Sequence, residues 1–210
     1  DLNFGPVQGS GAFAAKLGDS HNYNLTLAIN HLDLDRLLTS AETDDGRDQN
    51  ESGNAAPSRP AFPKLPAIPK HIHGRAVITV DGMRYRGGVI SQVQLDASVE
   101  KGNLRLDRLA ALLPGGSDLL LSGDTGSQDG TPRLKGRIEL ASNNLRSLLK
   151  WLNTNPAQVP TGRLANLVLT SEFAVNATQA QITNMNLRLD STAIEGAATI
   201  WLRTILTAFT

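Results

Sequence analysis

The chain lacks cysteine, has few aromatic residues and carries no net charge. With no cysteine in 210 residues, disulfides, thiolate metal sites and cysteine nucleophiles are all excluded. A cysteine-free chain suits an oxidising compartment such as the periplasm, although many cytosolic proteins also lack cysteine. Lys and Arg together number 20, as do Asp and Glu, and aromatic residues make up 4%. Because nucleic-acid binding relies on clustered cations and stacking aromatics, no nucleic-acid partner is predicted.

Long apolar runs are also missing. No stretch approaches the roughly 20 apolar residues that a membrane-spanning helix requires. We therefore expect this part of the protein to be soluble, with any membrane anchor outside it. Asp1 already begins a segment with strand character and no signal peptide is visible. The expected organisation is one β-rich domain over residues 1–210, cut from a longer protein.

Alternation of apolar and polar residues dominates what is present. Tyr23, Leu25, Leu27 and Ile29 fall on one side of an extended chain, with polar residues between them. Antiparallel sheets with one dry face show this pattern. It recurs at 76–80, 93–99, 104–106 and 185–189. The predicted fold class is mainly β: a curled antiparallel β-meander, groove-like or sandwich-like, with two short helices.

Glycine-containing turn signals separate the predicted strands. Their spacing is typical of a meander. They lie at 81–82, 87–88, 101–103, 114–116 and 123–124.

The two helices are predicted near 34–38 and 144–153. Asp33 or Asp35 can cap the first, because a carboxylate at a helix start accepts from free backbone N–H groups. The second carries an apolar stripe of leucines. Its candidate caps are Ser142, Asn143 and Asn144.

Residues 39–70 differ in composition from the rest of the chain. The first part is polar and acidic and the second is rich in proline. Neither part offers enough apolar surface to offset its ordering entropy, so a flexible loop is predicted. Its acidic residues form a loose cation-loop pattern without the spacing of a calcium hand, and a solvated acidic run is the favoured interpretation. These residues are Asp44, Asp45, Asp48 and Glu51.

Residues with catalytic or metal-binding chemistry are sparse. His71 and His73 could begin a metal site, but no third ligand is evident and solvated histidines are the favoured interpretation. Asp33 and Asp35 could be a carboxylate pair, although helix capping already accounts for them. No serine lies in a nucleophile elbow. No catalytic residue, metal or cofactor is predicted, and the chain is not expected to be an enzyme.

Two arginines flank an aromatic residue beside a predicted turn. Arg84 and Arg86 on either side of Tyr85 could meet a phosphate or a lipid headgroup. The favoured interpretation is a solvent-facing edge whose positive charges prevent pairing with other strands.

The apolar strand faces outnumber the helices that could cover them. Either the sheet folds over itself, or it curls into a groove whose dry lining meets an apolar partner. The occupant of such a groove would be apolar. The candidate lining residues of the groove are Leu25, Leu27, Ile29, Ile78, Val80, Val93, Leu95, Leu187 and Leu189.

Two segments, at 90–123 and 132–152, resemble the AsmA family of bacterial envelope proteins. In that family a strand with G-x-L-x-L leads to an l-x-A-x-l-x-G-G motif, and later strands lead to a short helix with an L-x-x-L-L pattern. The matching positions are Gly102, Leu104, Leu106, Leu109, Ala111, Leu113, Gly115 and Gly116, then Leu145, Leu148 and Leu149. The resemblance covers residues 74 to about 200, and Pro114 stands where an aromatic is common.

The resemblance implies a non-enzymatic periplasmic protein that is anchored to the inner membrane in its full-length form. Such proteins support outer-membrane assembly and phospholipid transport along a hydrophobic β-groove. An alternative is a scaffold that binds another envelope protein through a sheet edge. A hydrolase would require an acid–base group to assemble from residues distant in sequence.

Overall fold

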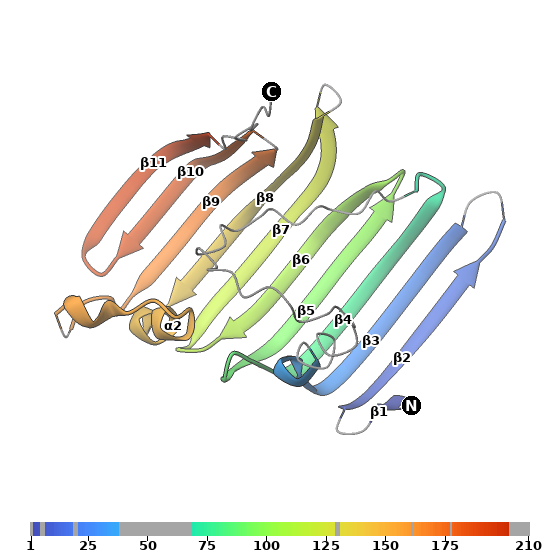
Figure 1. Cartoon of the computed structure of the whole chain (residues 1–210), viewed down its shortest axis with the longest axis horizontal. Helices are drawn as coiled ribbons and strands as arrows, with labels where there is room; N and C mark the ends of the chain where they lie inside the picture. The colour runs from blue at the N-terminus through green and yellow to red at the C-terminus, as the bar shows by residue number, and fades with distance from the viewer. Residues whose placement is uncertain are drawn as a thin grey trace, which may run out of the picture.

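The computed structural model describes residues 2–4, 7–18, 21–37, 69–128, 131–160, 162–176 and 178–201. In these ranges eleven strands form a single sheet in which the spatial order is the chain order (Figure 1). The strands are β1 (Leu2–Phe4), β2 (Val7–Lys16), β3 (His21–Asp33), β4 (Ile72–Tyr85), β5 (Gly88–Glu100), β6 (Asn103–Leu113), β7 (Ser117–Gln128), β8 (Thr131–Ser142), β9 (Leu167–Asn176), β10 (Gln179–Leu189) and β11 (Thr192–Trp201).

Helices are short and few in the described part of the chain. Residues 34–37 form one helical turn after β3, α2 spans Leu145–Trp151, and a 3₁₀ helix, η1, spans Pro156–Gln158. The predicted class, a mainly β meander with two short helices, is confirmed. Residue 38 of the first predicted helix and residues 39–68 of the predicted loop lie outside the described residues.

Neighbouring strands pair antiparallel with one exception. β3 and β4 run parallel, with Leu27 opposite Ile78. A parallel pair needs a long connection that returns to the starting edge, and the chain between Asp33 and Ile72 supplies it. Alternation in sequence indicates which face a residue occupies but not the direction of its neighbour, so this exception was not predicted.

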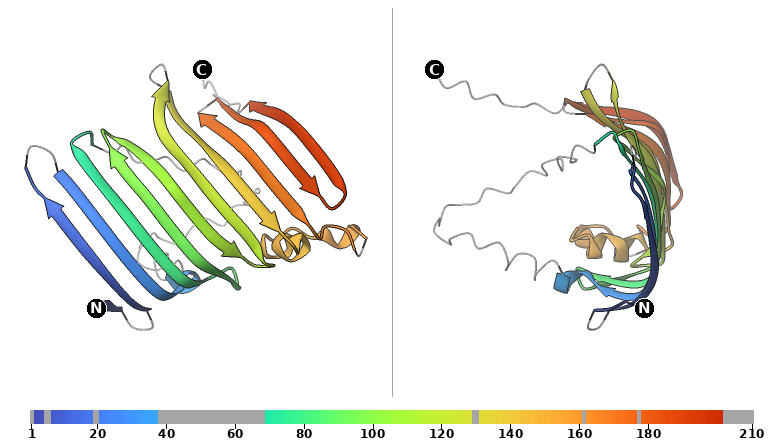
Figure 2. Two further views of the ribbon diagram at one scale, coloured as in Figure 1. Left: turned by 180° about the vertical axis from the view of Figure 1, so that it is seen from behind. Right: turned by 90° about the vertical axis from the view of Figure 1, so that its right-hand side faces the viewer.

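The sheet is curved along its strands. Figure 2 shows each strand bending toward the side on which α2 lies. Register shifts occur in the pairs β5–β6, β6–β7, β9–β10 and β10–β11. Such bulges bend and twist strands, which accounts for part of the curvature. We call the concave side the inner face and the convex side the outer face. The described strands form one layer, so they match the groove form of the prediction rather than the sandwich.

Two predicted turns are wrong. Residues 81–82 lie inside β4 and residues 123–124 lie inside β7. Gly123 instead allows β7 and β8 to lie close together, because a Cβ there would be 2.5 Å from the carbonyl oxygen of Lys135. The turns near residues 87, 101–102 and 114–116 are confirmed.

Both predicted helix caps are found among the named candidates. The Asp33 carboxylate accepts from the backbone N–H of Arg36 at 3.0 Å. The Asn144 side chain accepts from the backbone N–H of Ser147 at 3.2 Å and caps α2. Each replaces a hydrogen bond that the helix backbone lacks at its start.

Candidate functional site: the inner face of the sheet

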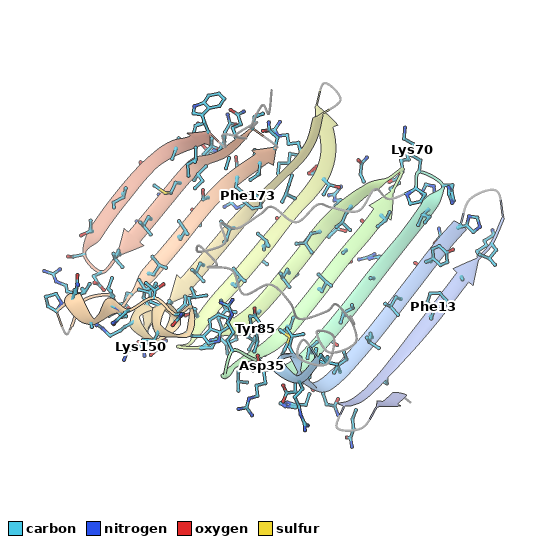
Figure 3. The ribbon with its side chains drawn as sticks, viewed as in Figure 1. Phe13, Asp35, Lys70, Tyr85, Lys150 and Phe173 are labelled. Carbon is cyan, nitrogen blue, oxygen red and sulfur yellow. The ribbon has the colours of Figure 1, made fainter. Side chains whose placement is uncertain are left out.

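One row of side chains crosses the inner face from β2 to β11 without a charge. Residues paired directly across neighbouring strands point to the same face, so the strand register defines the row. We call it the inner row: Phe13, Leu25, Ala76, Ala97, Leu106, Gly123, Gly136, Phe173, Ile182 and Ala198. Since strands lie roughly 4.8 Å apart, the row is on the order of 40 Å long. Figure 3 labels two of its members, Phe13 on β2 and Phe173 on β9.

A second row runs parallel to the first on the same face. It is also apolar until it reaches Ser171. Its members are Gly11, Leu27, Ile78, Leu95, Leu109, Leu121, Ile138 and Ser171. Two adjacent apolar rows make the inner face a continuous dry strip rather than a set of separate patches.

The nine predicted lining residues all lie on the inner face. Leu25 belongs to the inner row, and Leu27, Ile78 and Leu95 belong to the second row. The other five fall in two further groups. Ile29, Val80 and Val93 follow one another across β3, β4 and β5. Leu187 and Leu189 pack in the cluster beneath α2.

The adjacent row on the outer face is polar. It consists of Asn24, Arg75, Ser98, Arg105, Asp124, Lys135, Ala174, Gln181 and Thr199. Arg75 and Asp96 form an ion pair at 2.6 Å, and Lys135 and Asp124 form another at 3.5 Å. The hydrogen bond and charge of Arg75 lower the pKa of Asp96 below its ordinary value. These two rows therefore differ in chemistry, with charge on the outer row and none on the inner row, although their residues alternate in sequence.

Two parts of the inner face are closed off in the described structure. In one, Val80, Ile90, Val93 and Ala111 form a buried cluster against which Trp151 of α2 packs. The other lies beneath the body of α2. Leu145 and Leu148 of α2 are buried against Leu167, and this cluster includes the partly buried Leu187 and Leu189. Burying a leucine is worth about 1.5–3 kcal/mol, so these contacts hold α2 on the sheet. Elsewhere the inner row is half-buried, and Phe13 at its β2 end is 67% exposed.

The buried serines on the inner side have hydrogen-bond partners, whereas the buried Nδ1 atom of His21 has none among the described residues. Ser117 is fully buried and its hydroxyl lies 2.7 Å from the Ser142 hydroxyl. The buried Ser171 hydroxyl donates to carbonyl oxygens of the sheet, including that of Thr183 at 3.2 Å. Because their hydrogen-bonding capacity is used within the protein, these serines add little polarity to the face.

A pair of glycines shapes the centre of the inner row. Gly123 and Gly136 face each other across β7 and β8, and Phe173 is paired with Gly136. A Cβ at Gly136 would lie 2.7 Å from the Phe173 ring. The missing side chains thus give the phenyl ring room to lie across the strand, and the row stays apolar there.

The histidines do not form a metal site in the described chain. His73 is paired with Asn22, whereas the His71 ring lies 5.3 Å from that of His21, centre to centre. His21 thus lies close to His71 in space although the two residues are far apart in sequence. Among the described residues no group of three potential metal ligands is present. The acidic residues of 44–51 lie outside the described residues.

Asp35 has a different role from the predicted one. Its carboxylate accepts from the backbone N–H groups of Arg86 at 2.7 Å and Gly87 at 3.2 Å. It therefore fixes the β4–β5 turn to the helical turn at 34–37, and Asp33 alone caps that turn. Sequence reasoning missed this contact because its partners lie about fifty residues away.

Other lining residues were not named from the sequence. The inner row continues through Leu106 and Phe173, and the second row through Leu109, Leu121 and Ile138. Their alternation in sequence was the available signal. Register shifts in β6 and β10 interrupt that alternation and obscured part of it.

The outer face also has a shallow open depression of about 630 Å³ over β6–β10. Charged side chains, including Arg105, Asp107, Arg137 and Glu172, line it. Most of them are exposed, and Arg105 and Asp107 already form an ion pair at 2.7 Å. It therefore lacks the enclosed apolar surroundings that small-molecule sites usually have.

Comparison of the chain with protein-family models, with curated proteins and with solved structures finds no match in any of the three. The likeness to the AsmA family thus rests on the sequence motifs alone. In the described residues no helix is both long and apolar enough to cross a bilayer.

Proposed function

We propose that the inner face binds phospholipid acyl chains and that the protein is a non-enzymatic component of the bacterial envelope. In this proposal it is periplasmic, anchored to the inner membrane by a segment outside this chain, and supports phospholipid transport and outer-membrane assembly. The observation that carries the proposal is the inner row, which runs uncharged from Phe13 to Ala198 across ten consecutive strands.

Elementary energetics favour an acyl chain as the ligand. Each methylene group moved from water to an apolar surface contributes about 0.8 kcal/mol, so a half-covered lipid tail gains enough to bind. The inner row supplies no charge and no hydrogen-bond donor that a polar ligand would need for orientation. The length of the row also exceeds what a compact small molecule would occupy.

The first test is chemical analysis of the purified protein. We expect organic-solvent extracts of the protein, expressed in a bacterium and purified without detergent, to contain phospholipid by mass spectrometry. The ratio of lipid to protein should be reproducible between preparations. Extracts free of lipid, from protein that also fails to take up a fluorescent phospholipid, would contradict the proposal.

A pair of neighbouring substitutions separates the two faces. Ile78 lies in the second row of the inner face, and exposed Thr79 points to the outer face. Ile78→Asn should weaken fluorescent-phospholipid binding about tenfold, since its amide loses water when a lipid tail covers it. Thr79→Asn should leave binding unchanged. Equal affinities for both variants would place the lipid elsewhere.

The scaffold alternative is favoured by one observation, the state of β11. All ten residues of β11 are exposed, and in the described part of the chain only β10 pairs with it. An unpaired strand edge can accept another strand. Proteins that crosslink to β11, from protein whose extracts contain no lipid, would support this alternative over lipid binding.

A further inference from the structure

Midway along one edge of the sheet, three separate elements that meet at the β4–β5 turn carry exposed apolar and cationic side chains. We call this region the hairpin corner, because it surrounds the β4–β5 turn. Its apolar members are Leu37, Val89 and Leu152, which are 50%, 59% and 47% exposed. Its cationic members are Arg84, Arg86 and Lys150, all exposed.

Specific contacts hold these elements together. Besides the bonds from the β4–β5 turn to Asp35, the Trp151 indole N–H at the end of α2 donates to the Tyr85 carbonyl oxygen at 3.0 Å. The Tyr85 and Trp151 rings meet edge to face with centres 6.3 Å apart. Figure 3 places Asp35, Tyr85 and Lys150 along the same edge of the sheet. These contacts fix the three elements relative to one another at the β4–β5 turn. Val89 and Arg84 point to the outer face there, whereas Lys150 and Leu152 belong to the α2 segment on the inner side, so a partner that approaches the turn end-on would meet both.

The corner is positively charged although the chain is neutral. Among the described residues no ion pair involves Arg84, Arg86 or Lys150. The Arg86 guanidinium lies 5.3 Å from the centre of the Tyr85 ring, which directs it without neutralising it. The carboxylate of Asp35 is already hydrogen-bonded to the turn backbone. The other carboxylate at the turn is Asp33, which is paired with Arg84 across β3 and β4. The three cations therefore outnumber the two carboxylates and leave an excess of positive charge for an anionic partner.

We propose that the hairpin corner docks on the surface of a bilayer that contains anionic phospholipid. Aliphatic side chains that enter the headgroup layer beside cations that meet lipid phosphates are the combination that holds proteins at a membrane interface. The turn is free to approach such a surface, since a Cβ at Gly87 would meet nothing within 4 Å. An acidic protein surface would use the cations but would leave the three aliphatic side chains without an apolar environment. This surface lies at the end of the strands, outside the inner row, so the proposal goes beyond lipid-chain binding and can fail independently of it.

The test is flotation of the whole chain with vesicles. One set contains phosphatidylcholine alone, and the other an equal mixture of phosphatidylcholine and phosphatidylglycerol. We expect binding only to the anionic vesicles, and weaker binding as salt is raised, because salt screens the attraction. Each cation near an anionic surface changes partitioning roughly fivefold, so the double variant Arg84→Gln and Arg86→Gln should bind roughly 25-fold less.

Two further variants make the result specific. Val89→Ser removes an exposed aliphatic side chain from the corner and should also reduce partitioning. Arg188→Gln removes an exposed cation from the outer face of β10 and should leave partitioning unchanged. Circular dichroism checks that each variant keeps its fold.

Several outcomes would overturn the docking proposal. They are equal binding to both vesicle sets, unchanged binding of the double arginine variant, and binding to immobilised polyglutamate without binding to vesicles. The last would indicate an acidic protein partner instead. Ile78→Asn on the inner face should leave vesicle docking intact, so failure of the lipid-groove proposal is recognised separately.

Discussion

The inner face has two regions of the same chemistry that differ in what covers them. Beneath α2, Leu148 is 2% exposed and packs with Leu145 and Leu167 in a closed cluster. Toward the two ends of the sheet, Phe13 is 67% exposed and Ile200 is 57% exposed, and the inner row between them is only half-buried. Both regions are lined by apolar side chains on the same side of one sheet.

This comparison distinguishes apolar side chains that stabilise the fold from apolar side chains that stay accessible on the inner face. In the covered region, apolar side chains stabilise the fold because α2 removes them from water. In the open region the same side chains are only partly removed from water by their neighbours in the sheet, yet the row remains uncharged across every strand from β2 to β11. Extended apolar surface of this kind usually marks a binding site, so the open region is the part that we propose binds lipid. A substitution in one region should therefore leave the other region intact.

The largest effect on stability is expected in the covered region. Leu148→Ala should lower the free energy of unfolding by about 2–5 kcal/mol, because it leaves a cavity under α2. Urea unfolding followed by circular dichroism measures this loss. Leu152→Ala, at a side chain 47% exposed, is the matched control and should change stability by no more than about 0.5 kcal/mol. Similar losses for the two variants would show that α2 does not close the region as described.

In the open region, the informative substitution is one that enlarges a side chain and so obstructs lipid binding, rather than one that truncates a side chain. Ala97 is half-buried in the inner row, and Ala141 is exposed on the outer face. Ala97→Trp places a bulky ring in the path of a bound lipid tail and should reduce fluorescent-phospholipid binding about tenfold or more, equivalent to about 1.4 kcal/mol. Ala141→Trp adds the same ring outside and should bind lipid normally. Undiminished binding by the Ala97 variant would contradict a ligand lying along the row.

The smallest effect concerns pH and the segment that joins α2 to β9. The Asp190 carboxylate accepts from the backbone N–H groups of Asn166, Leu164 and Ala165 at 2.9–3.0 Å, and these bonds lower its pKa below the ordinary value. Its contribution to stability is therefore complete above the ordinary pKa near 4 and is lost as pH falls through the lower folded value.

The stability difference between the wild type and Asp190→Asn should accordingly shrink as pH is lowered from about 5 toward about 2. Thermal melts across that range measure the difference. Asp118→Asn, at an exposed carboxylate on β7, is the control for general charge effects. A difference that stays constant with pH would show that the Asp190 carboxylate does not stabilise this segment.

Alternation in the sequence predicted the faces of the sheet well. Period two placed Leu25 and Leu27 on one face of their strand and Ile78 on one face of another, and the strand register brings the three residues onto the same face of the sheet. The residue that caps α2 was one of three adjacent candidates, because the residues that cap helices with a side-chain oxygen stand directly before the first helical turn in the sequence. Both successes depend on interactions between residues close in sequence.

The features that sequence analysis missed depend on residues far apart in the chain. The parallel pairing of β3 with β4 leaves no mark on the alternation of either strand. Asp35 was interpreted as a local cap, but its partners lie in the β4–β5 turn. The glycine at position 123 was interpreted as a turn, although it permits close approach to Lys135 in a neighbouring strand. In each case the determining contact exists only after the sheet has assembled.

The most direct test of lipid binding at the inner face is site-specific photocrosslinking on two adjacent residues. A benzophenone amino acid is placed at Leu25, in the inner row, or at Asn24, which points to the outer face. After irradiation in cells, mass spectrometry of the purified protein should detect covalent phospholipid adducts at position 25 and none at position 24. Adducts at both positions to the same extent, or at position 24 alone, would contradict the assignment of the inner face as the lipid-binding surface.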